Sequence, residues 1–130
     1  MGIKQPWLKK PKTKPELPGS GVCIASARAL LQDAEQKFSR RQFAQAAVQA
    51  KSTALKAAEA LLAWRDLDIP RTERGLLDLF EKEIVQPGHV QPALGQALHQ
   101  ILASAPTELE TRQAIKKAGL FLDRARDIVT

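Results

Sequence analysis

Hydrophobic side chains recur at intervals of three and four residues over most of this chain, which is the spacing of one face of an α-helix. No run of β-branched residues interrupts the pattern, and strong helix formers (Ala, Leu, Gln, Glu, Lys and Arg) dominate the composition. The helical spacing is present in five segments: residues 22–38, 40–65, 72–85, 92–104 and 108–129. Because short connections join them, the sequence predicts an all-α fold, an antiparallel up-and-down bundle of four to five helices.

Polar and proline residues mark the predicted helix ends. Ser39 with Gln42, and Thr107 with Glu110, have the spacing of a capping box, in which two side chains satisfy the first free N–H groups of a helix. The first pair predicts a helix start at residue 40 and the second a start at residue 108. Pro70 limits any helix before it, and Pro106 ends the fourth helix.

The second predicted helix is unusually rich in alanine. The stretch "QAAVQAKSTALKAAEALL", residues 45–62, contains seven alanines in eighteen residues. Small side chains let neighbouring helices approach closely, so this helix is expected to lie at the centre of the bundle. Its predicted buried stripe consists of Phe43, Ala47, Ala50, Ala54, Ala57 and Leu61.

Charge divides the chain into two parts. Residues 1–20 contain four prolines, five lysines and one glutamate, and are predicted to form a basic, flexible tail, whereas residues 21–130 form the helical bundle. The tail carries +4 of the formal net charge of +6. Two interpretations remain open: a solubilising tail, or an arm that binds nucleic acid or another polyanion in a salt-sensitive way. The arm's candidate lysines are Lys9, Lys10, Lys12 and Lys14.

The composition argues against several classes of protein. No apolar run is long enough to span a membrane, and the N-terminal stretch lacks the apolar core of a secretory signal. The single Cys23 excludes an internal disulfide and fits a reducing cytoplasm, so a cytoplasmic location is expected. With two histidines, one cysteine and no ligand spacing, neither a metal site nor a cofactor is expected.

Three stretches resemble the HEPN domain family. They are "FSRRQFAQAAVQAKSTALKAAEALLAW", "LDIPRTERGLLDLFEKEIV" and "TELETRQAIKKAGLFLDRARDIV", in the last of which the small Ala118 precedes the aromatic Phe121. The resemblance covers roughly residues 25–129 and is strongest in "ALKAAEALL". It implies a small helical bundle that often forms homodimers and accompanies a nucleotidyltransferase, or acts as a metal-independent ribonuclease in toxin–antitoxin and defence systems.

The ribonuclease motif of that family is missing here. The motif places an Arg about four to six residues before a His, so that a cation and a proton-shuttling imidazole face one groove. The corresponding residues are Pro92, Ala93 and Leu94 before His99, and Lys82, Glu83 and Ile84 before His89. The resemblance therefore implies a non-catalytic domain that binds a nucleotide, a nucleic acid or a partner such as a nucleotidyltransferase. The alternatives are a ribonuclease that uses His99 or His89, and a protein-interaction module with a polyanion-binding tail.

Basic residues of the bundle supply further candidate sites. Lys51 and Lys56 flank the alanine stripe, and Arg71 and Arg74 lie at the start of the third predicted helix, where free N–H groups attract anions. Each pair is a candidate for nucleotide or nucleic-acid binding. The alternatives are that Lys51 and Lys56 solubilise the helix, and that Arg71 and Arg74 form local ion pairs with Asp66, Asp68 and Glu73. The stretch "KKAGLFLDRARD" alternates in charge at helical spacing and indicates a solvated helix face.

Overall fold

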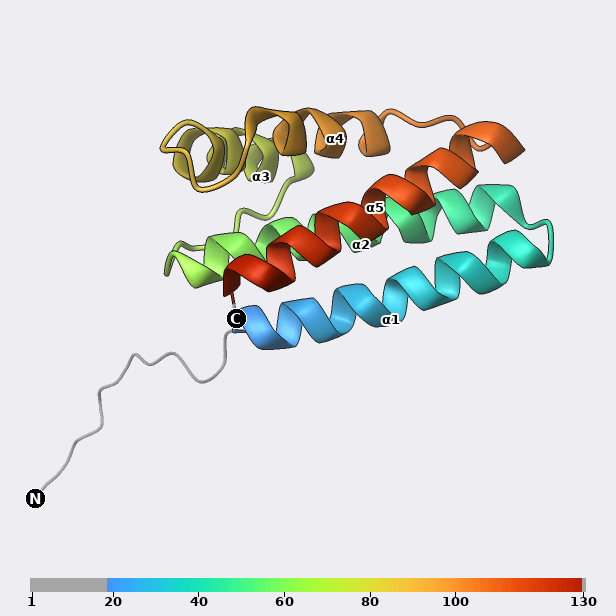
Figure 1. Cartoon of the computed structure of the whole chain (residues 1–130), viewed down its shortest axis with the longest axis horizontal. Coiled ribbons are helices and arrows are strands. Elements are labelled where there is room, and N and C mark those ends of the chain that lie inside the picture. Colours follow the sequence, from blue (N-terminus) through green and yellow to red (C-terminus); the bar gives the residue numbers. More distant parts are fainter. Residues whose placement is uncertain (1–18, 130) are drawn as a thin grey trace, which may run out of the picture.

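The computed structural model describes residues 19–129 of the chain as a bundle of helices (Figure 1). The helices are α1 (Ser20–Ser39), α2 (Phe43–Trp64), α3 (Glu73–Phe80), the π-helical segment η2 (Glu81–Val85), α4 (Pro92–Leu102) and α5 (Glu108–Val129). Strands are absent from this part of the chain, so the all-α prediction is confirmed. No helix within it is long and apolar enough to cross a membrane.

The long helices α1, α2 and α5 lie side by side (Figure 1). The chain reverses between α1 and α2, and again between α4 and α5, so each of these pairs is antiparallel. The Thr111 hydroxyl donates a hydrogen bond to the Phe43 carbonyl at 3.5 Å, which brings the starts of α2 and α5 together. These two helices therefore run in the same direction, with α1 against one side of the pair and α4 against the other.

The alanine stripe explains how α2 and α5 approach so closely. Seven of the nine alanines of α2 are buried: Ala46, Ala47, Ala50, Ala54, Ala57, Ala58 and Ala60. The facing helix α5 contributes Ala114, Ala118 and Ala125 to the same core. In an up-and-down bundle, helices that run in the same direction ordinarily lie on opposite corners, so small residues on both are needed for direct contact. The prediction of a closely surrounded second helix is confirmed.

Larger side chains fill the space beside α2 where α3 and η2 cross the end of the bundle. Phe80 of α3 packs edge-on against Phe121 of α5, with 5.8 Å between ring centroids. Gly95 of α4 lies close against η2. A Cβ added at Gly95 would come within 3.1 Å of a Val85 methyl group, so a larger residue there would crowd η2. The helix predicted over residues 72–85 is observed as two parts, the α-helix α3 and the π-helical segment η2.

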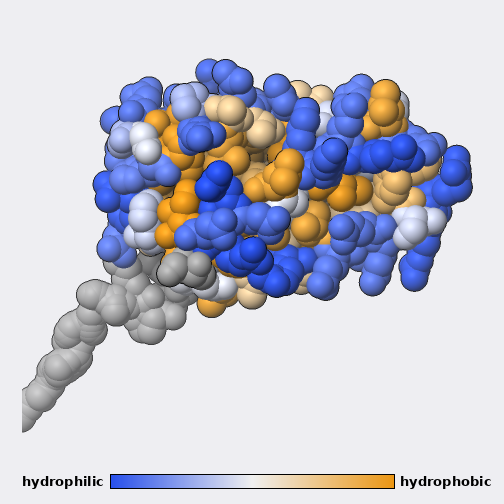
Figure 2. Space-filling model, viewed as in Figure 1, coloured by the Kyte–Doolittle hydropathy of each residue, from blue (hydrophilic) through white to orange (hydrophobic). Residues whose placement is uncertain are grey.

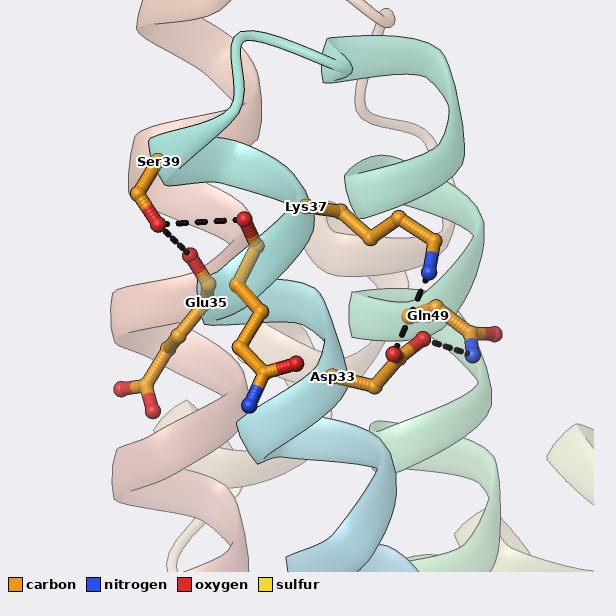
Figure 3. A network of polar contacts seen from close by, with 6 residues as sticks. Asp33, Glu35, Lys37, Ser39 and Gln49 are labelled. Atoms are coloured by element: carbon orange, nitrogen blue, oxygen red, sulfur yellow. Dashed lines mark hydrogen bonds and ion pairs between the residues drawn. The ribbon is translucent and has the colours of Figure 1, made fainter.

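The capping box predicted at Ser39 and Gln42 does not form, and this prediction was wrong. Ser39 is the last residue of α1, and its hydroxyl donates to the carbonyls of Glu35 and Gln36, both at 3.0 Å (Figure 3). Arg41 adopts a left-handed conformation with φ of 61°, and the Gln42 N–H bonds back to the Lys37 carbonyl. This is the pattern of a Schellman motif, which ends a helix instead of starting one.

The capping box predicted at Thr107 and Glu110 is present with a small difference, and a further cap is found at Thr72. The Thr107 hydroxyl accepts from the Glu110 N–H at 3.3 Å, while the Glu110 carboxylate accepts from the Ala105 N–H at 2.9 Å. Thr72 lies just outside α3 as its N-cap and accepts from the Gly75 N–H at 3.0 Å. The helix starts at residues 108 and 73 are therefore both fixed by side chains, of which the sequence analysis predicted the first.

A polar contact connects α1 and α2 across their solvent-facing seam (Figure 3). The Asp33 carboxylate accepts from Gln49 Nε2 of α2 at 2.6 Å and from Lys37 Nζ, one helical turn along α1, at 3.2 Å. These two donors stabilise the ionised carboxylate and lower the pKa of Asp33 below its usual 3.8, with Gln49 making the larger contribution.

Candidate functional site

A shallow groove of about 280 Å³ lies between α4 and α5. Eight side chains line it: Gln91, Ala93, Leu94 and Ala97 on the α4 side, and Lys117, Leu120, Phe121 and Arg124 on α5. In Figure 2, apolar side chains reach the surface over α4 and α5, between hydrophilic neighbours. We call this feature the α4–α5 groove.

The sequence of each helix places these side chains at the groove. Pro92 occupies the first turn of α4, where a missing N–H costs nothing, and Leu94 and Ala97 follow on one face. On α5, the residues Lys117, Leu120 and Arg124 recur at intervals of three and four and so share a face. Phe121 lies beneath them and is fully buried, whereas Leu120 is 61% exposed. The groove thus has an aliphatic surface over an aromatic base.

Two cations and no carboxylate line the α4–α5 groove. Lys117 Nζ donates to Gln100 Oε1 of α4 at 2.8 Å, so it is held at the edge of the groove by a neutral partner. Within residues 19–129, the Arg124 guanidinium forms no ion pair, which leaves its charge available to a ligand. The groove is therefore suited to a ligand that is both apolar and anionic.

The four cations predicted in the bundle are not part of this groove. Lys56 pairs with Glu59 at 3.1 Å, and Lys51 is half-buried on α2. Arg71 lies in the loop before α3, and Arg74 lies in the first turn of α3; both are exposed. The two pairs belong to different elements, and neither contributes to the α4–α5 groove, so an anion site at either pair stays a prediction. The tail lysines Lys9, Lys10, Lys12 and Lys14 lie outside the described residues.

The two histidines lie in different surroundings. His89 follows η2 and packs edge-on against Trp64 at the end of α2, with 5.3 Å between ring centroids. His99 is exposed in the last turn of α4. Neither imidazole forms a hydrogen bond or an ion pair with an arginine in the described part of the chain. A ribonuclease centre would need an arginine within reach of one of them.

Cys23 and the acidic residues offer no further chemistry in the described structure. The Cys23 side chain is buried, and burial, with a smaller effect from Glu59, raises the pKa of its thiol. A thiol that is both enclosed and protonated is a poor nucleophile. No group of three or more His, Cys, Asp or Glu side chains in residues 19–129 is arranged to hold a metal ion.

Comparison of the fold with solved structures finds a related bundle. A crystal structure of a HEPN domain protein from Thermotoga maritima superposes with a TM-score of 0.53, covering 82% of this chain and 90% of the other. The two sequences are 15% identical over the alignment. The chain has the fold of a HEPN domain. The scan against protein-family models and the search of curated proteins find no match.

The HEPN fold confirms the resemblance drawn from the alanine-rich helix and the last helix. The α4–α5 groove lies at residues of α5 that the sequence pattern presented as an ordinary solvated face. The signal available in the sequence was the apolar pair Leu120 and Phe121 between two cations on one helix. Recognising a groove required knowing that α4 packs beside that face.

Proposed function

We propose that this chain is a non-catalytic HEPN-fold domain that works as an accessory subunit and binds a protein partner through the α4–α5 groove. The partner classes that the resemblance implies are a nucleotidyltransferase and a toxin–antitoxin component. The observation that carries the proposal is an aliphatic groove with Leu120 61% exposed and with cations at its border. Apolar surface rimmed by polar side chains is typical of protein-interaction sites.

The arrangement of the histidines supports a binding role over the ribonuclease alternative. Neither His89 nor His99 has an arginine at the motif spacing, and His89 packs on Trp64 instead of facing another titratable group. Nucleotide binding in the bundle has less support than partner binding. Its predicted cations lie apart, and one of them, Lys56, is already paired with Glu59.

The test is a pull-down of the tagged full chain from its native lysate, with nuclease treatment and mass spectrometry of the eluate. Two leucines of α5 give a matched pair of variants, because Leu120 in the groove and Leu109 outside it are 61% and 62% exposed. We expect one protein to co-purify stoichiometrically after nuclease treatment. Leu120→Glu should abolish its capture, whereas Leu109→Glu should leave it unchanged.

Two results would contradict the proposal. Elution of the chain with nuclease-sensitive material alone would favour nucleic-acid binding by the bundle or the tail. Equal loss or equal retention of the partner in both leucine variants would place the interface elsewhere. Circular dichroism and thermal denaturation of each variant establish that the bundle is intact, which is expected because both side chains are exposed.

A further inference from the structure

We propose that the α4–α5 groove binds an acidic amphipathic helix of the partner, with two carboxylates two helical turns apart and leucine-like side chains between them. This inference rests on the proposed function and specifies the chemistry of the partner segment. Three observations carry it: the spacing of the two cations, the aliphatic character of the surface between them, and the charge of the chain itself.

The spacing of the cations selects the length and shape of the ligand. Lys117 and Arg124 are seven residues apart on α5, so they lie on one face, about 10.5 Å apart along the helix axis. One small anion does not reach both cations at that separation. A helix that lies along α5 presents carboxylates at positions i and i+7 with the same separation and on one face.

The surface between the cations fits aliphatic side chains better than nucleobases. Leu94, Ala97 and Leu120 supply aliphatic side chains to the lining, and the aromatic Phe121 beneath them has no exposed surface. Single-stranded nucleic acids are commonly bound by exposed aromatic rings that stack on the bases. Since the α4–α5 groove exposes no ring, an apolar helix face is the better complement to it.

The charge of the chain argues for a separate, acidic partner as the occupant. The groove has no carboxylate in its lining, and the chain carries a net charge of +6. The chain's own N-terminal stretch holds five lysines and one glutamate, so its charge opposes entry into a cationic groove. A second copy brings the same positive excess. An acidic helix instead gains attraction from the two cations of the groove.

Two helix-constrained synthetic peptides of identical composition test the proposal with the full-length chain. The first has glutamates at positions i and i+7 with leucines at i+3 and i+4. The second has its glutamates at i and i+2, which point to different faces. Fluorescence anisotropy measures the Kd of each labelled peptide. We expect the first to bind up to about fivefold more tightly, because the second peptide keeps only one of its two glutamates on the face that meets the cations and so loses one exposed ion pair.

Matched variants connect that preference to the two cations. Lys117→Gln and Arg124→Gln should each reduce the preference for the first peptide. Lys116→Gln is the control, because it removes the same charge from the adjacent exposed position outside the groove. Equal affinity for the two peptides, no measurable binding, or an equal effect of the control would overturn the inference. Tighter, Lys117-dependent binding of a single-stranded oligonucleotide would also overturn it and favour a nucleic acid as the ligand.

These results can be separated from those of the pull-down. If a partner is captured through Leu120 while the peptides show no dependence on glutamate spacing, the accessory role stands and the acidic helix is excluded. If nothing is captured through Leu120, the proposed function itself fails.

Discussion

At the scale of single residues, the contact around Asp33 gives the fold a defined response to acid. Gln49 and Lys37 both donate to the Asp33 carboxylate and lower its pKa. A carboxyl group whose pKa is lower in the folded chain contributes stability above its unfolded-state pKa and loses it as the pH falls through the folded-state value. The contact between α1 and α2 is therefore expected to weaken below the usual Asp pKa of 3.8.

Asp33→Asn tests this expectation. At neutral pH the variant should have a lower free energy of unfolding than the natural chain, and the difference should shrink to zero as the pH falls well below 3.8. Chemical denaturation across that pH range measures it. Gln49→Ala provides the check, because removing the main donor should lower the free energy of unfolding by a similar amount. The double variant should lose less stability than the sum of the losses in the two single variants. Strict additivity would show that the Asp33–Gln49 hydrogen bond does not couple the helices.

The turn between α1 and α2 shows where residue patterns mislead. The letters "SRRQ" have the spacing of a capping box, yet Arg41 adopts the left-handed conformation that usually belongs to glycine. Its guanidinium lies 5.4 Å from the Phe43 ring centroid and 3.6 Å from the Glu108 carboxylate of α5. Phe43 is local, but Glu108 belongs to a helix distant in the sequence, so the local pattern alone does not show all the contacts that Arg41 makes at this helix end.

At the scale of helices, alanine at position 54 is required by the close approach of α2 to its neighbours. Ala54 is fully buried in the core. Ala54→Leu inserts three heavy atoms into a packed interface and should lower the free energy of unfolding by about 1–3 kcal/mol or more. Ala44→Leu is the control on the same helix, because Ala44 is exposed and leucine suits a helix. Urea denaturation compares the two, and equal stability would contradict the packing described here.

Helices are also the scale at which sequence reasoning succeeded most. The three- and four-residue periodicity located all the helices of the described region, because each must bury one stripe of its surface. The same periodicity could not reveal the α4–α5 groove. Lys117 and Arg124 resemble any solvated pair until α4 is placed beside them, and the sequence pattern does not show which helix packs there. The division of the third helix into α3 and η2 was likewise not predicted from the sequence pattern.

At the scale of the whole molecule, positive charge is concentrated at one end of the chain. Residues 1–18 hold five lysines and one glutamate, so their removal lowers the net charge from +6 to +2. Their lysines are the candidates for salt-sensitive binding of polyanions, whereas the α4–α5 groove belongs to the bundle. Deletion of residues 1–18 is therefore expected to reduce polyanion binding and to leave partner binding at the α4–α5 groove in place.

Deletion of residues 1–18 should weaken binding of the chain to double-stranded DNA of arbitrary sequence and reduce its dependence on salt. Each lysine that contacts a phosphate contributes about 0.9 to the slope of log K against log salt concentration, because it releases condensed counterions. Fluorescence anisotropy over a salt series measures the slope, and replacement of the same lysines by glutamine controls for chain length. Capture of the protein partner through Leu120 should survive the deletion. At low salt, the complex with the partner should form more slowly than with the full-length chain. An unchanged slope would assign polyanion binding to cations of the bundle such as Lys51 and Arg71, and would leave the N-terminal lysines without a role in it.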